Sequence, residues 1–291
     1  MEMASELWRL RTATSDDVGR LTTLLRHAYW AHFHADWRLP ADWIGYPGFV
    51  LAEPVGAASL AGCLCIAPDP PPASWVRLAA LRDTAEQFAV LRDLMEAALA
   101  AVSGEAISEI ALLGNDAKLE EWLPALGFRI VNEVITFVHN DLQTAAPPAT
   151  SGSPVSVRRV RLDDLPRLVA IEEAAFDPIW RHSREGLALG WQHALSFHVA
   201  ELGGAIAGFQ YSARSDRPRA AHLVRLTVDP SFQRQGVGST LLAAALASYF
   251  GQGYDAVSLN TQADNVASQR LYERFGFTLA GYPIPVWRRT L

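Results

Sequence analysis

The pattern of apolar and polar positions predicts that strands and helices alternate along the chain. Branched apolar side chains fill residues 221–228 and stop at an Asp-Pro pair, which predicts a strand. An apolar helix is predicted at 241–250, another strand at 257–260, and another helix from Asn265. Each half of the chain has the order strand, helices, two-stranded hairpin, longer strand, helix, strand, helix, strand. This order predicts an α/β fold (an α+β mixed sheet in each half) flanked by helices.

The same order occurs twice because the second half of the chain repeats the first. Five segments match in sequence, at an almost constant offset: LR-DDVGRL with VR-DDLPRL, FVLAE with FHVAE, LAG with IAG, VRL with VRL, and LGF with FGF. Five matches in one order indicate a duplicated fold. In the first matched segment, Asp16 and Asp163 are predicted to cap a helix with their side-chain oxygens.

A small, polar and proline-rich stretch, residues 144–154, separates the two copies and is typical of a linker. The predicted organisation is therefore an N-terminal domain at 1–143, the linker, and a C-terminal domain at 155–291.

Composition narrows the possible functions. Hydrophobic residues make up 50% of the 291 residues, which is enough for two packed cores, and the formal net charge of -6 gives no basic face for nucleic acid. The two cysteines, Cys63 and Cys65, have neither zinc nor redox spacing and are expected to face one core, so no metal is expected. No signal peptide or membrane-length apolar run is recognised, so we expect a cytoplasmic protein without a membrane partner.

A glycine-containing turn follows the strand at 221–228 and leads into the apolar helix. Its sequence, FQRQGVGST at 232–240, places Gly236 and Gly238 where backbone amides can approach a ligand. The first turn of a helix offers unpaired N–H groups and a positive dipole end, and Arg234 adds charge, so the turn suits a phosphate or pyrophosphate. Taken alone, it can equally be a tight connection.

A second motif, which runs from Asn265 to Phe277, decides between these two interpretations. Together the two motifs resemble the GNAT superfamily of acyl-CoA-dependent N-acetyltransferases, through Pro230, Gln233, Arg234, Gly236, Gly238, Leu241, Leu242, Asn265, Ala267, Leu271, Tyr272, Gly276 and Phe277. The resemblance is close from about residue 155 to the end, and the first half resembles the family only as a weakened copy. It implies a tandem pair of GNAT-like domains, as in fused acetyltransferases of this family, with one competent copy.

The resemblance also implies how acetyl-CoA, the co-substrate, is held. The turn cradles the pyrophosphate with its main-chain amides, and the preceding strand splays from its neighbour and bonds the pantetheine arm, which Asn265 also contacts. The implied cofactor-binding residues are Leu226, Thr227, Val228, Gln233, Arg234, Gln235, Gly236, Val237, Gly238, Ser239 and Asn265.

Two residues are the candidates for catalysis. By resemblance Tyr272 protonates the departing thiolate, and the alternative is that it only packs a helix on the sheet. His222 is the leading candidate for the general base, because it lies on the strand before the turn and has an ordinary pKa near 6.5. An unremarkable histidine at a strand end is an equal alternative, and Glu172 and Glu173 are weaker candidates.

The first half is not expected to form a second site. The segment equivalent to the turn, Ala85–Val90, has no glycine and contains Glu86, and Leu123 replaces the tyrosine. Aromatic and histidine residues gather around Trp30, His32 and His34, where core packing is favoured over a ligand pocket.

These observations predict an N-acetyltransferase that moves acetyl directly to a primary amine within a ternary complex. The acceptor is expected to be a small-molecule amine or a peptide N-terminus, and the sequence does not identify it. The alternative is a catalytically silent acyl-CoA-binding or sensing protein. A monomer with a pseudo-twofold pair of domains, or a weak homodimer, is expected.

Overall fold

The structure is a computed structural model that describes residues 7–34, 38–68, 70–114, 116–142 and 153–291. The chain forms two compact units. The N-terminal unit contains residues 1–131 and 286–291, and the C-terminal unit contains residues 132–285. In the described part of the chain, no helix has both the length and the apolar character needed to cross a membrane.

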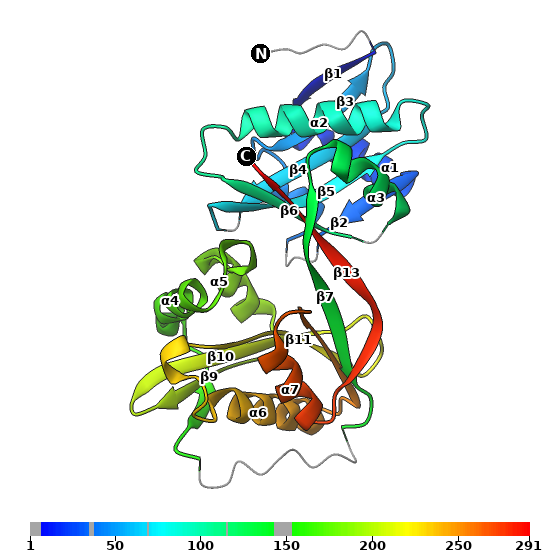
Figure 1. Ribbon diagram of the computed structural model, residues 1–291. Coiled ribbons are helices and arrows are strands. Elements are labelled where there is room, and N and C mark those ends of the chain that lie inside the picture. Colours follow the sequence, from blue (N-terminus) through cyan, green and yellow to red (C-terminus); the bar gives the residue numbers. More distant parts are fainter. Residues whose placement is uncertain (1–6, 35–37, 69, 115, 143–152) are drawn as a thin grey trace. The chain divides into compact units, whose positions relative to one another are not determined.

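The N-terminal unit is a mixed sheet with helices on both faces (Figure 1). Its strand order is β1-β3-β4-β5-β6, β2 pairs with β5, and the last residues of the chain pair with β6. The elements are β1 (Trp8–Thr12), α1 (Val18–Arg26), β2 (Trp30–Phe33), β3 (Phe49–Pro54), β4 (Gly62–Pro68), β5 (Ala73–Leu81), α2 (Gln87–Ala101), β6 (Glu109–Leu113) and α3 (Ala117–Ala125).

Two cores lie on opposite faces of this sheet because side chains alternate along the strands. Leu64, Ile66 and Leu81 face α2 and α3, whereas Cys63 and Cys65 face α1. The expectation that both cysteines enter one core is confirmed, and both are free thiols.

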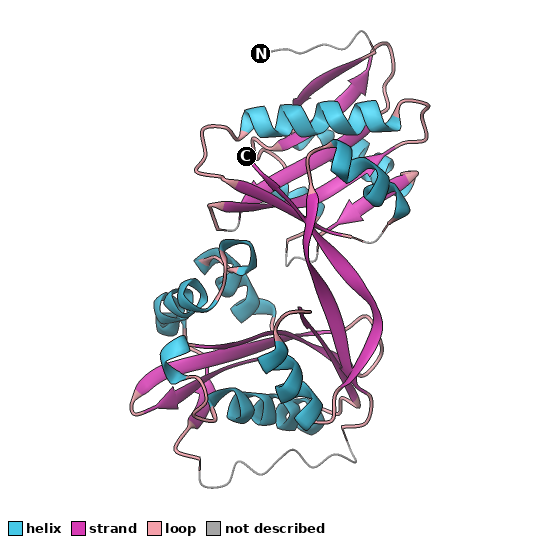
Figure 2. Cartoon of the chain, viewed as in Figure 1, coloured by secondary structure: helices cyan, strands magenta, loops and turns pink. Residues whose placement is uncertain are grey.

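The C-terminal unit repeats this plan, with the strand order β7-β12-β11-β10-β9-β8. Helices α6 and α7 cover one face, and α4 and α5 lie on the other (Figure 2). The elements are β8 (Ser156–Arg159), α4 (Leu165–Ala175), α5 (Arg184–His193), β9 (Ser196–Leu202), β10 (Ala205–Arg214), β11 (Ala220–Val228), α6 (Val237–Gly251), β12 (Ala256–Gln262) and α7 (Val266–Arg274).

The last strand of each half takes part in the sheet of the other unit. In β7 (Arg129–His139), residues 134–139 pair antiparallel with β12. In β13 (Thr278–Thr290), residues 286–290 pair antiparallel with β6. The boundary at 143/155 stays a prediction, and residues 143–152, which hold most of the predicted linker, lie outside the described residues.

An ion-pair network present in both units supports the duplication. Arg11 contacts Asp17 at 2.6 Å and Glu53 at 2.7 Å. At the matching positions Arg158 contacts Asp164 and Glu201, each at 2.8 Å. Each network joins the start of the first helix to two paired strands of its unit, β1 and β3 in the first and β8 and β9 in the second.

The same carboxylates correct the predicted helix caps. Asp17 accepts from the backbone N–H of Thr14 at 2.9 Å, and Asp164 accepts from that of Arg161 at 2.7 Å. The N-cap positions of these turns are Thr14 and Arg161, so Asp16 and Asp163 are not the caps; the carboxylates of Asp17 and Asp164, one position later, bond back to the N-cap N–H. The reason is that only the second aspartate of each pair points into the sheet, where it also meets the arginine.

Candidate active site

The centre of the candidate site is the point where β11 and β12 separate. Their parallel pairing runs from Ala220–Ala256 to Leu223–Leu259 and stops there, although both strands continue. On its other edge β11 stays paired with β10 as far as Val228, after a bulge beside Val224. Within the described residues, the β12-facing edge of residues 224–228 therefore has no partner strand.

This opening contains the three strand residues predicted to bind a pantetheine arm. Leu226 and Val228 pack toward α6, while Thr227 is buried toward α4 and donates to Glu172 at 3.0 Å. An edge without a partner strand leaves backbone donors and acceptors for an extended ligand. The predicted splay is thus present in the fold.

The turn after β11 has the backbone of an anion cradle. Gly236 has φ +85° and is the N-cap of α6, and Arg234 also has positive φ at 60°. A left-handed conformation favours glycine, which explains why position 236 carries one. The first α-type bond of the helix runs from the N–H of Thr240 to the carbonyl of Gly236 at 2.9 Å. The amides of Val237, Gly238 and Ser239 precede it and are not used by the helix.

The sequence-predicted loop residues lie together at this cradle. Gln233, Arg234, Gln235 and Gly236 are exposed, whereas Val237 is buried against the sheet. A side chain added at Gly238 would meet Leu271 and Val228 at 3.5 Å, an ordinary contact, so this position has room for one.

One cationic residue at the cradle was missed by the sequence reasoning. Arg274, on α7, donates to the side-chain oxygen of Ser239 at 2.5 Å. It places a second guanidinium beside the first turn of α6. Its position two residues after Tyr272 was visible in the sequence, but its contact with α6 depends on how the two helices pack.

Tyr272 lies on α7, on the same side of the sheet as α6. It is 5% exposed and packs against Phe137 and Phe277, with ring centroids 6.0 and 5.9 Å away. Burial raises the pKa of Tyr272 to about 12, and a hydrogen bond with Ser268 and the charge of Arg225 oppose this rise. The phenol therefore stays protonated at neutral pH, as a proton donor must.

Asn265 forms the N-cap of the same helix. Its side-chain oxygen accepts from the backbone N–H of Ser268 at 3.2 Å. A cap of this kind stabilises the helix start, and here it fixes the helix that carries Tyr272. The predicted contact of Asn265 with pantetheine stays a prediction.

His222 lies on the opposite face of the sheet from Tyr272. Its neighbour Leu223 is buried among residues of α6 and α7, so the alternation along β11 turns His222 to the other side. Its Nδ1 forms a hydrogen bond with the hydroxyl of Ser258 at 2.9 Å, and burial lowers the pKa of His222 below 6.5. A neutral imidazole next to the opening is able to accept a proton.

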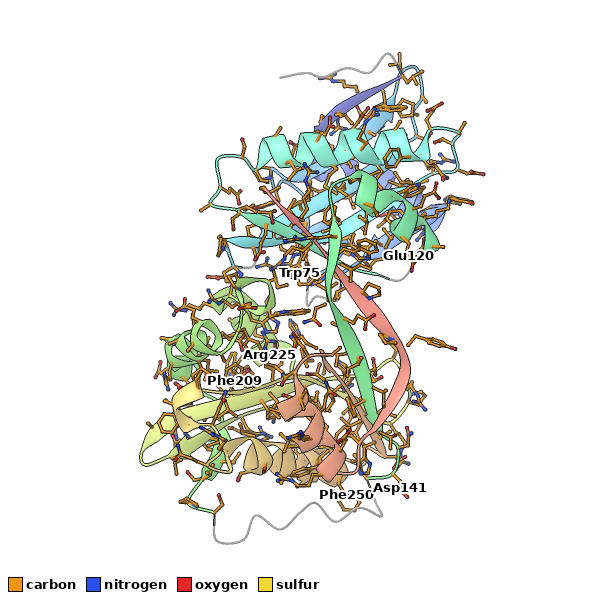
Figure 3. All side chains as sticks on the ribbon, in the orientation of Figure 1. Trp75, Glu120, Asp141, Phe209, Arg225 and Phe250 are labelled. Carbon is orange, nitrogen blue, oxygen red and sulfur yellow. The ribbon has the colours of Figure 1, made fainter. Side chains whose placement is uncertain are left out.

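Glu172 has a structural role that excludes it as a general base. It is fully buried, and both carboxylate oxygens accept hydrogen bonds, at 2.5 Å from Arg225 and at 3.0 Å from the hydroxyl of Thr227 and the N–H of His182. Arg225, which is labelled in Figure 3, also donates to the carbonyl of Trp180 and stacks on Phe176 at 4.1 Å. This ion pair fastens the segment after α4 to the strand at the opening.

The N-terminal unit shows the same separation of strands, but its own chain fills the opening. Pairing of β5 with β6 stops at Trp75–Ala111, and β2 then pairs antiparallel with residues 78–81 of β5. Because β5 covers 73–81 and β11 covers 220–228, these residues correspond to 225–228, where the ligand edge lies in the C-terminal unit. Strand β2 thus occupies the edge that a pantetheine arm needs.

The aromatic cluster of this unit is core packing around β2. Trp30 is buried and packs edge-on against Trp122, with ring centroids 5.8 Å apart. His34 stacks on Trp75 at 4.6 Å, and burial lowers the pKa of His32 to about 4. In the residues that the structure describes, the edge of β5 beyond Trp75 is therefore filled by β2, which the sequence alone did not indicate.

Comparison with known proteins decides the family of the C-terminal unit. The sequence model of the family described as Acetyltransferase (GNAT) family matches residues 165–277. These residues form a GNAT acetyltransferase domain. The match includes the splayed strand, the cradle, Asn265 and Tyr272, so the predicted acetyltransferase family is confirmed.

Relatives and solved structures agree with this GNAT assignment. The mycothiol acetyltransferase of Propionibacterium freudenreichii subsp. shermanii is 33% identical over 133 residues, 41% of this chain and 41% of the relative. That of Sanguibacter keddieii is 31% identical over 160 residues, 50% of each chain. The chain is thus matched over about half the length, or less, of these curated relatives.

The tandem fold is also found in a solved structure. The tandem GNAT protein from the clavulanic acid biosynthesis pathway superimposes with a TM-score of 0.63 at 15% identity, over 97% of this chain and 97% of that chain. The predicted fold, two GNAT-like copies with mixed sheets, is confirmed.

Proposed function

We propose that the C-terminal unit binds acetyl-CoA and moves its acetyl group to a primary amine. The observation that carries the proposal is that an open strand edge and an anion cradle meet at one point of one unit. The edge at 224–228 accepts an extended arm, and the cradle at Gln233–Ser239 accepts a pyrophosphate. Arg234 and Arg274 add positive charge at the cradle.

Acetyl-CoA, when bound, supplies an activated acetyl thioester. Two proton transfers accompany the reaction, and one residue on each face of the sheet carries out one of them. His222, on the face with α4 and α5, accepts the proton that the amine loses. Tyr272, on the face with α6 and α7, donates its phenolic proton to the leaving sulfur. Holding amine and thioester together at the opening supplies the remaining acceleration, and no covalent enzyme intermediate is needed.

The relatives named mycothiol acetyltransferase support transfer over the alternative of a silent acyl-CoA-binding protein. The acceptor is proposed to be a small molecule or a peptide N-terminus, and the protein to act in the cytoplasm as a monomer or weak homodimer.

The deciding experiment is calorimetric titration of acetyl-CoA into the whole protein and two glycine variants. Gly238→Glu places a carboxylate on the first turn of α6, and its Cβ would make ordinary 3.5 Å contacts with Leu271 and Val228. Gly251→Glu, at the other end of the same helix, points into open space and is the matched control.

We expect one site per chain, a loss of at least about tenfold in affinity for Gly238→Glu, and unchanged binding for the control. Two sites would mean that β2 does not block the N-terminal unit. No binding to the unmodified protein would refute the proposed function.

A further inference from the structure

A row of polar side chains crosses three strands on the face of the C-terminal sheet that carries His222. Thr136 on β7 donates to the side-chain oxygen of Asn260 on β12 at 2.9 Å. Ser258 lies two residues earlier on β12, and its hydroxyl forms a hydrogen bond with Nδ1 of His222 on β11 at 2.9 Å. The four side chains form one face because Val257 and Leu259, which alternate with them, are buried toward α6 and α7.

The row lies at the opening between the strands. His222 and Ser258 are paired across the last stretch of the β11–β12 ladder, and Asn260 is the first residue of β12 beyond it. Asn260 is opposite Thr136 in the pairing with β7. Asn260 and Thr136 are therefore the polar side chains of the row that come next beyond the paired segment, on the side of the opening.

The row has unused hydrogen-bonding capacity. Asn260 is exposed, and its amide nitrogen, which has two donors, has no partner among the residues that the structure describes. The Nε2 of His222 likewise has no partner in the described part of the chain. The amide oxygen already accepts from the hydroxyl of Thr136, which fixes the orientation of the amide group.

The row is also uncharged, except for the positive charge that His222 gains when it is protonated. Arg225, a guanidinium on the adjoining part of this face, is engaged by Glu172 and is 11% exposed. Neither a carboxylate nor a phosphate on the acceptor would find a free counter-charge in the row. Neutral hydroxyl groups, which both donate and accept, match amide and hydroxyl side chains.

We infer that Asn260 and Thr136 form an acceptor subsite for a small polyhydroxylated amine, such as an amino sugar. This inference rests on the proposed function. Asn260 determines specificity through its amide nitrogen, and Thr136 positions it. Thr136 lies on β7, the last strand of the first half, which pairs with β12 in the C-terminal sheet. The N-terminal half of the sequence therefore takes part in acceptor recognition without binding acetyl-CoA.

The test compares two primary amines on six-membered rings, D-glucosamine with hydroxyl groups and cyclohexylamine without them. Because the two amines differ in basicity, the readout is the change in the ratio of their kcat/KM values between unmodified protein and variant. Asn260→Leu is expected to lower kcat/KM for glucosamine about tenfold, the effect of one lost hydrogen bond, and to change that for cyclohexylamine less than twofold. Thr136→Val is expected to act in the same direction.

Asn140→Leu is the matched control, because Asn140 is an exposed asparagine just after the same strand β7 but outside the row. Equal losses on both amines, or no loss, would overturn the subsite. So would a failure to acetylate glucosamine by a protein that binds acetyl-CoA in calorimetry, and this result would leave the proposed function standing. Failure to bind acetyl-CoA is the separate result that removes the proposed function.

Discussion

Replacing Glu172 by glutamine tests whether the buried ion pair supports the active-site strand. Glu172 is fully buried, the Arg225 side chain is 11% exposed, and their closest atoms are 2.5 Å apart. Glutamine keeps the shape of the side chain but removes the charge, so the guanidinium of Arg225 stays buried without its counter-charge. Breaking a buried pair from one side costs about 3–5 kcal/mol.

The assay is urea unfolding followed by circular dichroism, with and without acetyl-CoA. On the proposed function, the transition that acetyl-CoA moves to higher urea is that of the C-terminal unit. With a slope of about 2 kcal/mol per molar urea, the loss should shift this midpoint down by roughly 1.5–2.5 M.

Glu173→Gln is the matched control, since the neighbouring glutamate is exposed and should change stability by less than about 0.5 kcal/mol. Adding Arg225→Met to Glu172→Gln should recover part of the loss, because the uncompensated charge is then gone. A loss below about 1 kcal/mol for Glu172→Gln would refute the argument that the pair supports this unit.

Three further predictions follow from the site and from the repeated ion-pair network. Tyr272→Phe should lower kcat by about 10²-fold or more at unchanged affinity for acetyl-CoA, whereas Tyr249→Phe, which removes another buried hydroxyl, should not; equal turnover in both variants would exclude Tyr272 as the donor. Since burial lowers the pKa of His222, kcat/KM should be level above pH 6.5 and fall only as the pH drops through that lower pKa, and His222→Gln should remove this limb; an unchanged profile would point to another base. Arg11 lowers the pKa of Asp17, so Asp17 contributes stability that is fully present above its ordinary pKa of 3.8 and is lost as the pH falls; Asp17→Asn should flatten the acid limb of unfolding, with Asp16→Asn as the unaffected control.

Much of the candidate site could be predicted from the sequence because its requirements are local. A helix start that leaves amides for an anion needs a glycine at the left-handed position, and Gly236 occupies it. An asparagine before a helix caps it, and Asn265 does so. A tyrosine on the inner face of that helix points to the sheet, as Tyr272 does. These features depend on neighbours within a few residues, so they can be predicted from the local sequence.

The aspartate caps show where local reasoning stops. Asp16-Asp17 and Asp163-Asp164 are consecutive carboxylates that fit the cap pattern equally well. Asp17 and Asp164 make the hydrogen bond at the helix start because each also contacts an arginine on the adjoining strand. A contact across elements, which the helix pattern does not contain, decided between them.

By itself the sequence predicted the duplicated fold, the half that carries the GNAT motifs and the position of the glycine turn, since each depends on short-range patterns or on the internal repeat. Only the tertiary structure decided which sheet β7 and β13 complete, because an alternating strand fits the edge of either sheet until its partner is present. The same reason explains why β2 was not recognised as the strand that fills the opening of the N-terminal unit, and why the pairs Glu172–Arg225 and Thr136–Asn260 were not foreseen. Each joins residues far apart in the chain, and their distance is set by packing rather than by sequence spacing.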